Sequence, residues 1–227
     1  MSGSLVAMAT DSSGSSVVVT VRLAAGKDVS VIAALIRELA VFEKLEHACE
    51  VTDSKLESSL WNLPPFQGPT VLMLEVGGSR SEEDQHEQEE KDLNLQQQSF
   101  EEVVRELKLS SPIADPDAAS FRSTADERRI VAGFVLFFPN YSTFLAKGGF
   151  YVEDLYVRKP YRGRGLGTIL LKTVVQQAVR LGAGRVEWCV LDWNVDAIKF
   201  YQGLGASLLP EWRICRLTGK ALESCSL

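Results

Sequence analysis

Hydrophobic and polar residues alternate along the first third of the chain in a way that predicts strands and helices in turn. Val17–Leu23 is rich in β-branched residues and predicts a strand. The next segment predicts an amphipathic helix from Asp28 to about Leu45, because apolar residues recur at helical spacing: Ile32, Leu35, Ile36 and Leu39. A second helix is predicted over 52–60, and the apolar run 70–76 predicts a further strand.

The second half of the chain continues the alternation with longer apolar runs. Ile130–Phe138 predicts a buried central strand, and a turn at 139–142 leads to a strand at Phe150–Val157. The elements predicted after it are a helix from about Leu166 to Leu181, a strand at Arg185–Leu191, a helix at Val195–Gly203 and a final strand at Glu211–Leu217. Helices that alternate with strands predict an α/β fold. The direct strand-to-strand connection within 130–157 predicts that its sheet is mixed rather than all parallel.

Two stretches lack this apolar pattern. Residues 1–16 are rich in Ser and Gly and predict a disordered tail. Residues 78–129 include the acidic run EEDQHEQEEKD and predict a solvated surface insert with one short helix across Phe100–Leu109, although a binding tail is an alternative. The remainder predicts a single domain over 17–219, and 220–227 is a C-terminal tail.

The overall charge argues against one class of function. A net charge of −6 at pH 7 leaves no excess of Lys and Arg for a nucleic-acid surface. The four cysteines form no Cys-x-x-Cys pair and only two histidines are present, so we expect neither a metal site nor a disulfide framework. The N-terminal residues do not resemble a secretory signal, and no apolar run reaches the ~20 residues of a membrane helix. We therefore expect a cytoplasmic protein with no nucleic-acid or membrane partner.

The most informative segment is a glycine-rich turn between the strand that ends at Val157 and the helix that begins near Leu166. Gly163, Gly165 and Gly167 are separated by single residues, which lets successive backbone N–H groups point the same way. The start of the following helix adds a partial positive charge. Four cations surround the turn: Arg158, Lys159, Arg162 and Arg164. Together these features predict a cradle for a pyrophosphate.

Other interpretations of the turn compete with this one. A dinucleotide-binding fold expects Gly-x-Gly-x-x-Gly near the first strand, whereas these glycines occur late and in a different order. A P-loop ends in Gly-Lys-Ser/Thr, which this sequence lacks. Tight turns also need glycine for structural reasons alone, so the turn does not decide the function by itself.

Two motifs in this order resemble the GNAT family of acetyltransferases. Arg162-Gly-Arg-Gly-Leu-Gly167 is similar to the family's Arg/Gln-x-x-Gly-x-Gly/Ala signature, which binds the pyrophosphate of coenzyme A. The segment from Trp193 to Ala206 resembles the second half of the family's coenzyme A site. The resemblance implies a homodimer and a mostly antiparallel mixed sheet, splayed between its fourth and fifth strands where pantetheine inserts.

Further segments resemble the spermidine/spermine (diamine) N-acetyltransferase subfamily, especially plant members that acetylate ornithine, thialysine or short diamines. These segments are 36–43, 133–147, 150–157 and 211–213. The resemblance implies transfer of an acetyl group from acetyl-CoA to a primary amine of such a small molecule. It also implies the residues that contact acetyl-CoA: Leu155, Tyr156, Val157, Arg162, Gly163, Arg164, Gly165, Leu166, Gly167, Thr168, Asn194, Ala197 and Tyr201.

Transfer from a thioester to an amine requires groups that accept and supply protons. An alkylammonium group titrates at about 10.4, so it must lose a proton before the nitrogen attacks. The resemblance assigns this proton to Glu153 as general base, with an electrostatic anchor for the ammonium as the alternative. It assigns Tyr201 as the acid that protonates the sulfur, with a packing aromatic as the alternative. The residues predicted to bind the substrate are Phe42, Glu43, Glu46, Glu153, Asp154, Glu211 and Trp212.

The identity of the amine stays open at this point. Lys44 and His47 depart from a more acidic polyamine-type pattern and can accommodate a substrate carboxylate, which favours ornithine-like compounds. A peptide or protein acetyltransferase on the same fold is an alternative, and a non-catalytic sensor of coenzyme A is another. The sequence does not decide which nitrogen is acetylated.

Overall fold

The computed structural model describes residues 16–78 and 100–225, so the predictions for 1–15 and 79–99 lie outside the described residues. The chain divides into two compact units, Met1–Cys189 and Val190–Leu227, and each is described by itself. No helix in the described ranges is long and apolar enough to cross a membrane.

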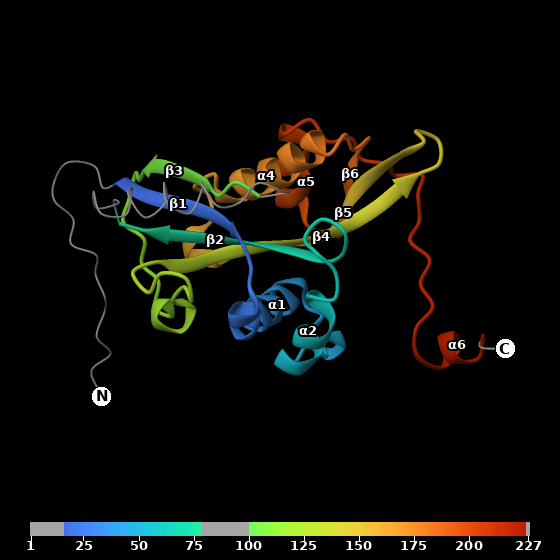
Figure 1. Cartoon of the computed structure of the whole chain (residues 1–227), viewed down its shortest axis with the longest axis horizontal. Helices are drawn as coiled ribbons and strands as arrows, with labels where there is room; N and C mark the ends of the chain where they lie inside the picture. The colour runs from blue at the N-terminus through green and yellow to red at the C-terminus, as the bar shows by residue number, and fades with distance from the viewer. Residues whose placement is uncertain (1–15, 79–99, 226–227) are drawn as a thin grey trace. The chain divides into compact units, whose positions relative to one another are not determined.

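A six-stranded mixed sheet forms the centre of the first unit (Figure 1). Its strands are β1 (Ser16–Leu23), β2 (Thr70–Gly77), β3 (Val103–Lys108), β4 (Ile130–Ser142), β5 (Lys147–Val157) and β6 (Val186–Trp188). They lie in the order β3-β1-β2-β4-β5-β6, and every neighbouring pair is antiparallel except β5 and β6. The predicted mixed, mostly antiparallel sheet is confirmed.

The sheet opens between β5 and β6. Phe150–Val152 pairs in parallel with Val186–Trp188, and the pairing ends there. Residues 154–157 keep β4 as a partner, with Leu155 opposite Val135, but no described strand pairs with their other side. β5 and β6 correspond to the fourth and fifth strands predicted from the sequence, because β3 was not predicted as a strand.

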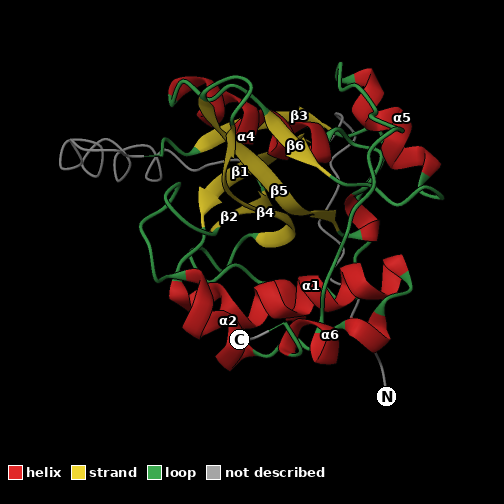
Figure 2. Cartoon of the chain, turned by 90° about the vertical axis from the view of Figure 1, so that its right-hand side faces the viewer, coloured by secondary structure: helices red, strands yellow, loops and turns green. Residues whose placement is uncertain are grey.

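Helices cover both faces of the sheet (Figures 1 and 2). On one face lie α1 (Val29–Glu43) and α2 (Asp53–Leu60), and on the other lies α4 (Leu166–Arg180). The apolar residues of α1 that were predicted from their spacing turn inward, and Ile32 and Leu35 are completely buried. Leu170 and Val174 do the same for α4. Burial of these faces from water supplies the main favourable free energy of folding.

One predicted helix is instead a strand. Residues 103–108 form β3, which pairs antiparallel with β1 from Ser16 opposite Lys108 to Val21 opposite Val103. A short isolated helix is marginal in water. The free edge of β1 offers backbone partners along the whole segment, so tertiary pairing overrides the local pattern. Part of the predicted 78–129 insert therefore belongs to the sheet.

Three further predictions change. The turn lies at 143–146 rather than 139–142, because Pro139–Ser142 continues β4 and pairs with the start of β5. The strand predicted at 185–191 is limited to β6. Glu211–Leu217 is irregular rather than a strand. A strand needs a partner for its backbone groups, and the described residues of the second unit form only the helices α5 (Val195–Gly203) and α6 (Gly219–Glu223).

A buried ion pair fastens the segment before β4 to the end of β5. Arg158 donates two hydrogen bonds to the carboxylate of Asp115, at 2.6 and 3.0 Å, and the two side chains are only 2% and 4% exposed. Tyr161 donates a third hydrogen bond to the same carboxylate at 2.9 Å. The Arg158 guanidinium also lies 3.6 Å from the ring centre of Phe121. Bidentate geometry and a second donor together satisfy the buried carboxylate.

Asp115→Asn should therefore destabilise the first unit. The substitution removes the nearer counter-charge of the buried Arg158 and leaves Glu38, at 3.6 Å, as a more distant one. Loss of one partner of a buried pair costs about 3–5 kcal/mol. Denaturant unfolding at neutral pH would measure the loss. The matched control is Asp117→Asn, because Asp117 is an exposed acid two residues along. Equal stability of both variants and the wild type would show that the ion pair contributes nothing.

Candidate functional site

The glycine-rich turn connects β5 to α4 with its backbone in the left-handed region. Gly163 has φ 72° and Gly165 has φ 79°, conformations that favour glycine. A Cβ atom at either position would meet no atom within 4 Å, so the space beside both residues is open. The first helical hydrogen bond is donated by Ile169 to Gly165 at 3.1 Å, which leaves the preceding N–H groups of α4 without partners inside the helix. This end of α4 is suited to an anion.

The four cations near the turn have different roles. Arg158 is buried in an ion pair with Asp115, so the prediction that it contributes to phosphate binding is wrong. Arg164 donates to the carbonyl oxygens of Ser111 and Pro112, at 3.0 and 3.3 Å, and so holds the segment before β4. The sequence did not reveal these partners because they lie more than 40 residues earlier, in a stretch read as a solvated insert.

Arg162 turns toward α1. Its Nε donates to the carbonyl oxygen of Val157 at 2.8 Å. Its guanidinium carbon lies 4.4 Å from the ring centre of Phe42 and 5.2 Å from that of Tyr156. A cation over an aromatic face is attracted by the ring quadrupole. Arg162 thus joins the turn to the C-terminal end of α1, and Phe42 serves as its platform.

A β-bulge in β5 presents the predicted base. Phe137 lies opposite Val152 and Leu136 lies opposite Asp154, so Glu153 is the extra residue between them. Bulges redirect a side chain and are frequent next to active sites. Glu153 is exposed and Asp154 is half-buried.

Three carboxyl groups influence one another at this point. Burial, and then the charges of Glu153 and Glu43, raise the pKa of Asp154 to about 7. Burial also raises the pKa of Glu43, the last residue of α1. The structure therefore brings three of the predicted substrate-binding residues together. A fourth, Glu46, lies in the short 3-10 helix Glu46–Ala48 and is exposed.

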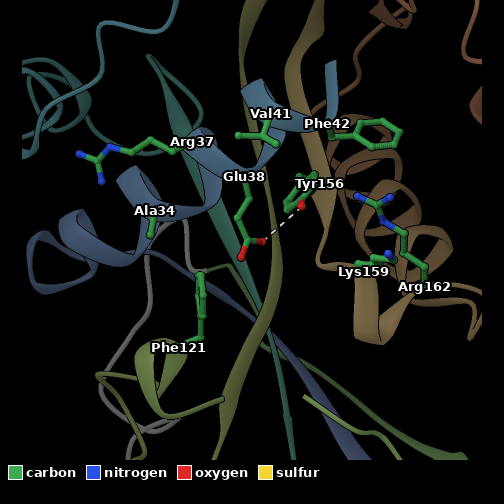
Figure 3. Close-up of a pocket in the computed structure, with 9 residues that line it drawn as sticks. All are labelled: Ala34, Arg37, Glu38, Val41, Phe42, Phe121, Tyr156, Lys159 and Arg162. Carbon is green, nitrogen blue, oxygen red and sulfur yellow. Dashed lines mark hydrogen bonds between the residues drawn. The ribbon is translucent and has the colours of Figure 1, made fainter. Parts of the chain in front are cut away.

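A pocket of about 540 Å³ lies beside this cluster on the α1 side of β5 (Figure 3). Its lining residues are Ala34, Arg37, Glu38, Val41, Phe42, Phe121, Tyr156, Lys159 and Arg162. At its centre the hydroxyl of Tyr156 donates to Glu38 at 3.2 Å, as Figure 3 shows. Burial, and then the Glu38 charge, raise the pKa of Tyr156 to about 12. The Tyr156 side chain therefore lies in this pocket, and sequence reasoning missed Glu38 altogether.

The main chain of β5 offers an open edge beyond Val152. Leu155 and Val157 lie in this part, where β4 pairs on one side and no strand of the described ranges pairs on the other. The carbonyl oxygen of Val157 already accepts the Arg162 hydrogen bond. An extended ligand can add to such an edge through backbone hydrogen bonds. The predicted contacts of pantetheine to Leu155 and Val157 have the open edge that they need.

The remaining predicted residues lie in the second unit. Asn194 caps α5, and its side-chain oxygen accepts the N–H of Ala197 at 3.3 Å. Tyr201 lies on the same helix with its ring centre 5.1 Å from that of Phe200. Glu211 and Trp212 belong to the irregular segment that follows α5. Across the described ranges, no group of three His, Cys, Asp or Glu residues is arranged to hold a metal ion.

Comparisons with known proteins agree with this arrangement. Residues 80–206 match the Acetyltransferase (GNAT) family. The chain is 48% identical over 204 residues to L-ornithine N5-acetyltransferase NATA1 of Arabidopsis thaliana, covering 90% of this chain and 86% of the relative. It is 33% identical to tyramine N-feruloyltransferase 4/11 of Nicotiana tabacum over 91% and 90% of the two chains. Thialysine N-epsilon-acetyltransferase of Mus musculus is 29% identical, with 89% and 94% covered.

Solved structures share the fold at low sequence identity. An integron cassette protein of V. cholerae, VCH_CASS6, superposes with a TM-score of 0.56 at 18% identity, over 91% of this chain and 96% of that one. The aminoglycoside acetyltransferase meta-AAC0020 from an uncultured soil metagenomic sample gives a TM-score of 0.54 at 13% identity, over 89% and 97%. The family match and the long alignments to curated acyltransferases show that this chain is a member of the GNAT family of N-acetyltransferases.

Proposed function

We propose that the protein transfers the acetyl group of acetyl-CoA to a primary amine of a small diamine, polyamine or ornithine- or thialysine-like amino acid. The observation that carries the proposal is the junction of β5 and α4. There, N–H groups that have no partner inside α4 and open glycine positions follow a strand edge to which no strand pairs within 16–78 and 100–225. An acidic cluster suited to a cationic amine lies on the same strand.

In this proposal the turn holds the diphosphate. Backbone N–H groups of Gly163–Thr168 donate to its oxygens, and the dipole of the 15-residue helix α4 favours the negative charge. The open edge at Leu155 and Val157 pairs with the amides of pantetheine. Both contacts use main-chain groups, so they place the thioester beside β5 without relying on a particular side chain.

The acids of β5 then prepare the amine. A substrate ammonium binds between Glu43, Asp154 and Glu153, and one of these carboxylates takes a proton from it. The free nitrogen attacks the thioester carbonyl carbon, an N–C bond forms, and the C–S bond breaks. Tyr201 donates a proton to the departing thiolate, whose basicity is below that of a phenolate. The second proton released by the nitrogen as the amide forms restores the Tyr201 phenol.

Asp154 is well matched to the proton-accepting role. A carboxyl group whose pKa is about 7 is partly ionised at neutral pH, and a base with a pKa near the working pH balances availability against proton affinity. Glu153 remains the base implied by family resemblance, and the two side chains are neighbours on the bulge. The homodimer and the cytoplasmic location stay predictions from the sequence.

The test is release of free thiol from acetyl-CoA against a panel of ornithine, thialysine, 1,4-diaminobutane, spermidine, tyramine and lysine peptides. We expect turnover of small amines and little with peptides. Turnover of peptides alone would refute the small-molecule assignment, and no turnover of any amine would favour a coenzyme A sensor.

Tyr201→Phe, which keeps the ring, should lower kcat while acetyl-CoA affinity stays unchanged.

Asp154→Asn should change the pH dependence of the reaction. In the wild type, kcat/KM for the amine should rise as pH passes about 7, because Asp154 then loses its proton. The variant should lack this rise with pH. Above pH 7 its kcat/KM should be lower than that of the wild type by roughly 10²-fold or more. If the step persists in Asp154→Asn and disappears in Glu153→Gln, then Glu153 is the base.

Stability provides a second readout for the same variant. The folded state binds the Asp154 proton more tightly than the unfolded chain, so wild-type stability should fall as pH rises from 3.8 to about 7. Asp154→Asn removes this dependence. Its melting temperature relative to the wild type should therefore be higher at pH 8 than at pH 5. An unchanged difference between the two pH values would mean that the carboxyl group titrates normally.

A further inference from the structure

The pocket beside the acidic cluster carries charges that the acetyl-transfer chemistry does not use. Three cations line it (Arg37, Lys159 and Arg162) against one carboxylate, Glu38. Glu38 is already engaged, because it accepts the Tyr156 hydroxyl and lies 3.6 Å from Arg158. Apolar walls complete the lining. A ligand that fits this environment has an anionic group and an aliphatic portion.

The three cations are not equally available. Arg37 points away from Tyr156 in Figure 3, toward the carbonyl oxygen of Val51 at 3.4 Å and the carboxylate of Asp53 at 3.7 Å. Arg162 lies against Phe42 and uses its Nε for Val157. Lys159 is exposed, and among the described residues no hydrogen bond or ion pair engages its ammonium. Lys159 is therefore the best-placed free cation of the lining.

The pocket and the acidic cluster share the same two elements. On β5, Tyr156 lines the pocket and Asp154 lies two residues before it, a separation of roughly 7 Å along a strand. On α1, Phe42 lines the pocket and Glu43 follows it directly. A short methylene chain spans such a distance. One molecule can therefore place an amine at Asp154 and a second functional group in the pocket.

We infer that this pocket binds the amino-acid end of the substrate. The α-carboxylate pairs with the ammonium of Lys159. The side chain passes Phe42 and delivers its terminal amine to Asp154. This inference rests on the proposed function, and it names α-amino acids with a terminal side-chain amine as the preferred substrates. Lys44 and His47, which the sequence suggested for the carboxylate, do not line the pocket.

A comparison of ornithine with 1,4-diaminobutane isolates the contribution of the substrate carboxylate. They carry the same terminal amine on the same methylene chain, and 1,4-diaminobutane lacks only the carboxylate. Lys159→Gln should lower the ratio of kcat/KM for ornithine to that for 1,4-diaminobutane by roughly tenfold or more, because a charge-assisted hydrogen bond is lost. Lys159→Glu should lower the ratio further, since the new charge repels the carboxylate and attracts the diamine.

Lys172→Gln is the matched control, because it removes the same charge from an exposed position on α4, across the sheet. It should leave the substrate ratio unchanged. An equal loss on both amines with a raised KM for acetyl-CoA in Lys159→Gln would overturn the inference and assign Lys159 to the phosphates. An unchanged ratio in both Lys159 variants would also overturn it. Failure of the wild type to acetylate either amine would instead refute the proposed function.

Discussion

The hydrogen-bonded ion pair between Arg158 and Asp115 fixes the place where β5 ends and the turn begins. Arg158 directly follows the last residue of β5, and its backbone N–H donates to Ala132 of β4 at 2.8 Å. Tyr161 joins the same carboxylate three residues later. The start of the turn is therefore held from the sheet side and from the segment before β4. A preorganised turn loses little conformational freedom when an anion binds, which is the usual route to affinity from main-chain groups.

Charge is separated along one strand and the turn that follows it. Glu153 and Asp154 concentrate negative charge at the bulge, while Lys159 and Arg162 lie a few residues further along. The two proposed substrates have opposite charges, a polyanionic acyl donor and a cationic amine. A strand that carries acids and then leads into cations can attract both to neighbouring places without neutralising either. The pKa of Asp154 is raised because this carboxyl group is buried and lies close to two other carboxylates.

Local patterns in the sequence were sufficient for the elements that hold the site. The apolar spacing in α1 and α4 and the β-branched runs of β1 and β2 predicted each of them, because these faces bury their side chains as their periodicity requires. The turn was predicted because only glycine adopts its backbone conformation readily. Acidic residues near the amine were predicted by resemblance, and three of them do lie together.

Features that depend on distant partners could not be predicted in this way. The sequence of β3 fits a helix equally well, and only its pairing with the free edge of β1 shows that it is a strand. Arg158 looks like one more cation beside the turn, and only its partner Asp115, 43 residues earlier, shows that it is buried. The bulge at Glu153 depends on the register between β4 and β5, and the pocket at Glu38 depends on the packing of α1 against β5. Such contacts are set by tertiary structure, which a single sequence does not encode locally.

Calorimetric titration with acetyl-CoA and with S-acetylpantetheine, which lacks the diphosphate and nucleotide, tests the central claim most directly. If the amides of Gly163–Thr168 bind the diphosphate, acetyl-CoA should bind far more tightly than S-acetylpantetheine. Gly165→Val should remove most of that difference, because a β-branched residue resists the φ of 79° that aligns these amides. Equal affinity for the two thioesters, or an undiminished difference in Gly165→Val, would contradict the account.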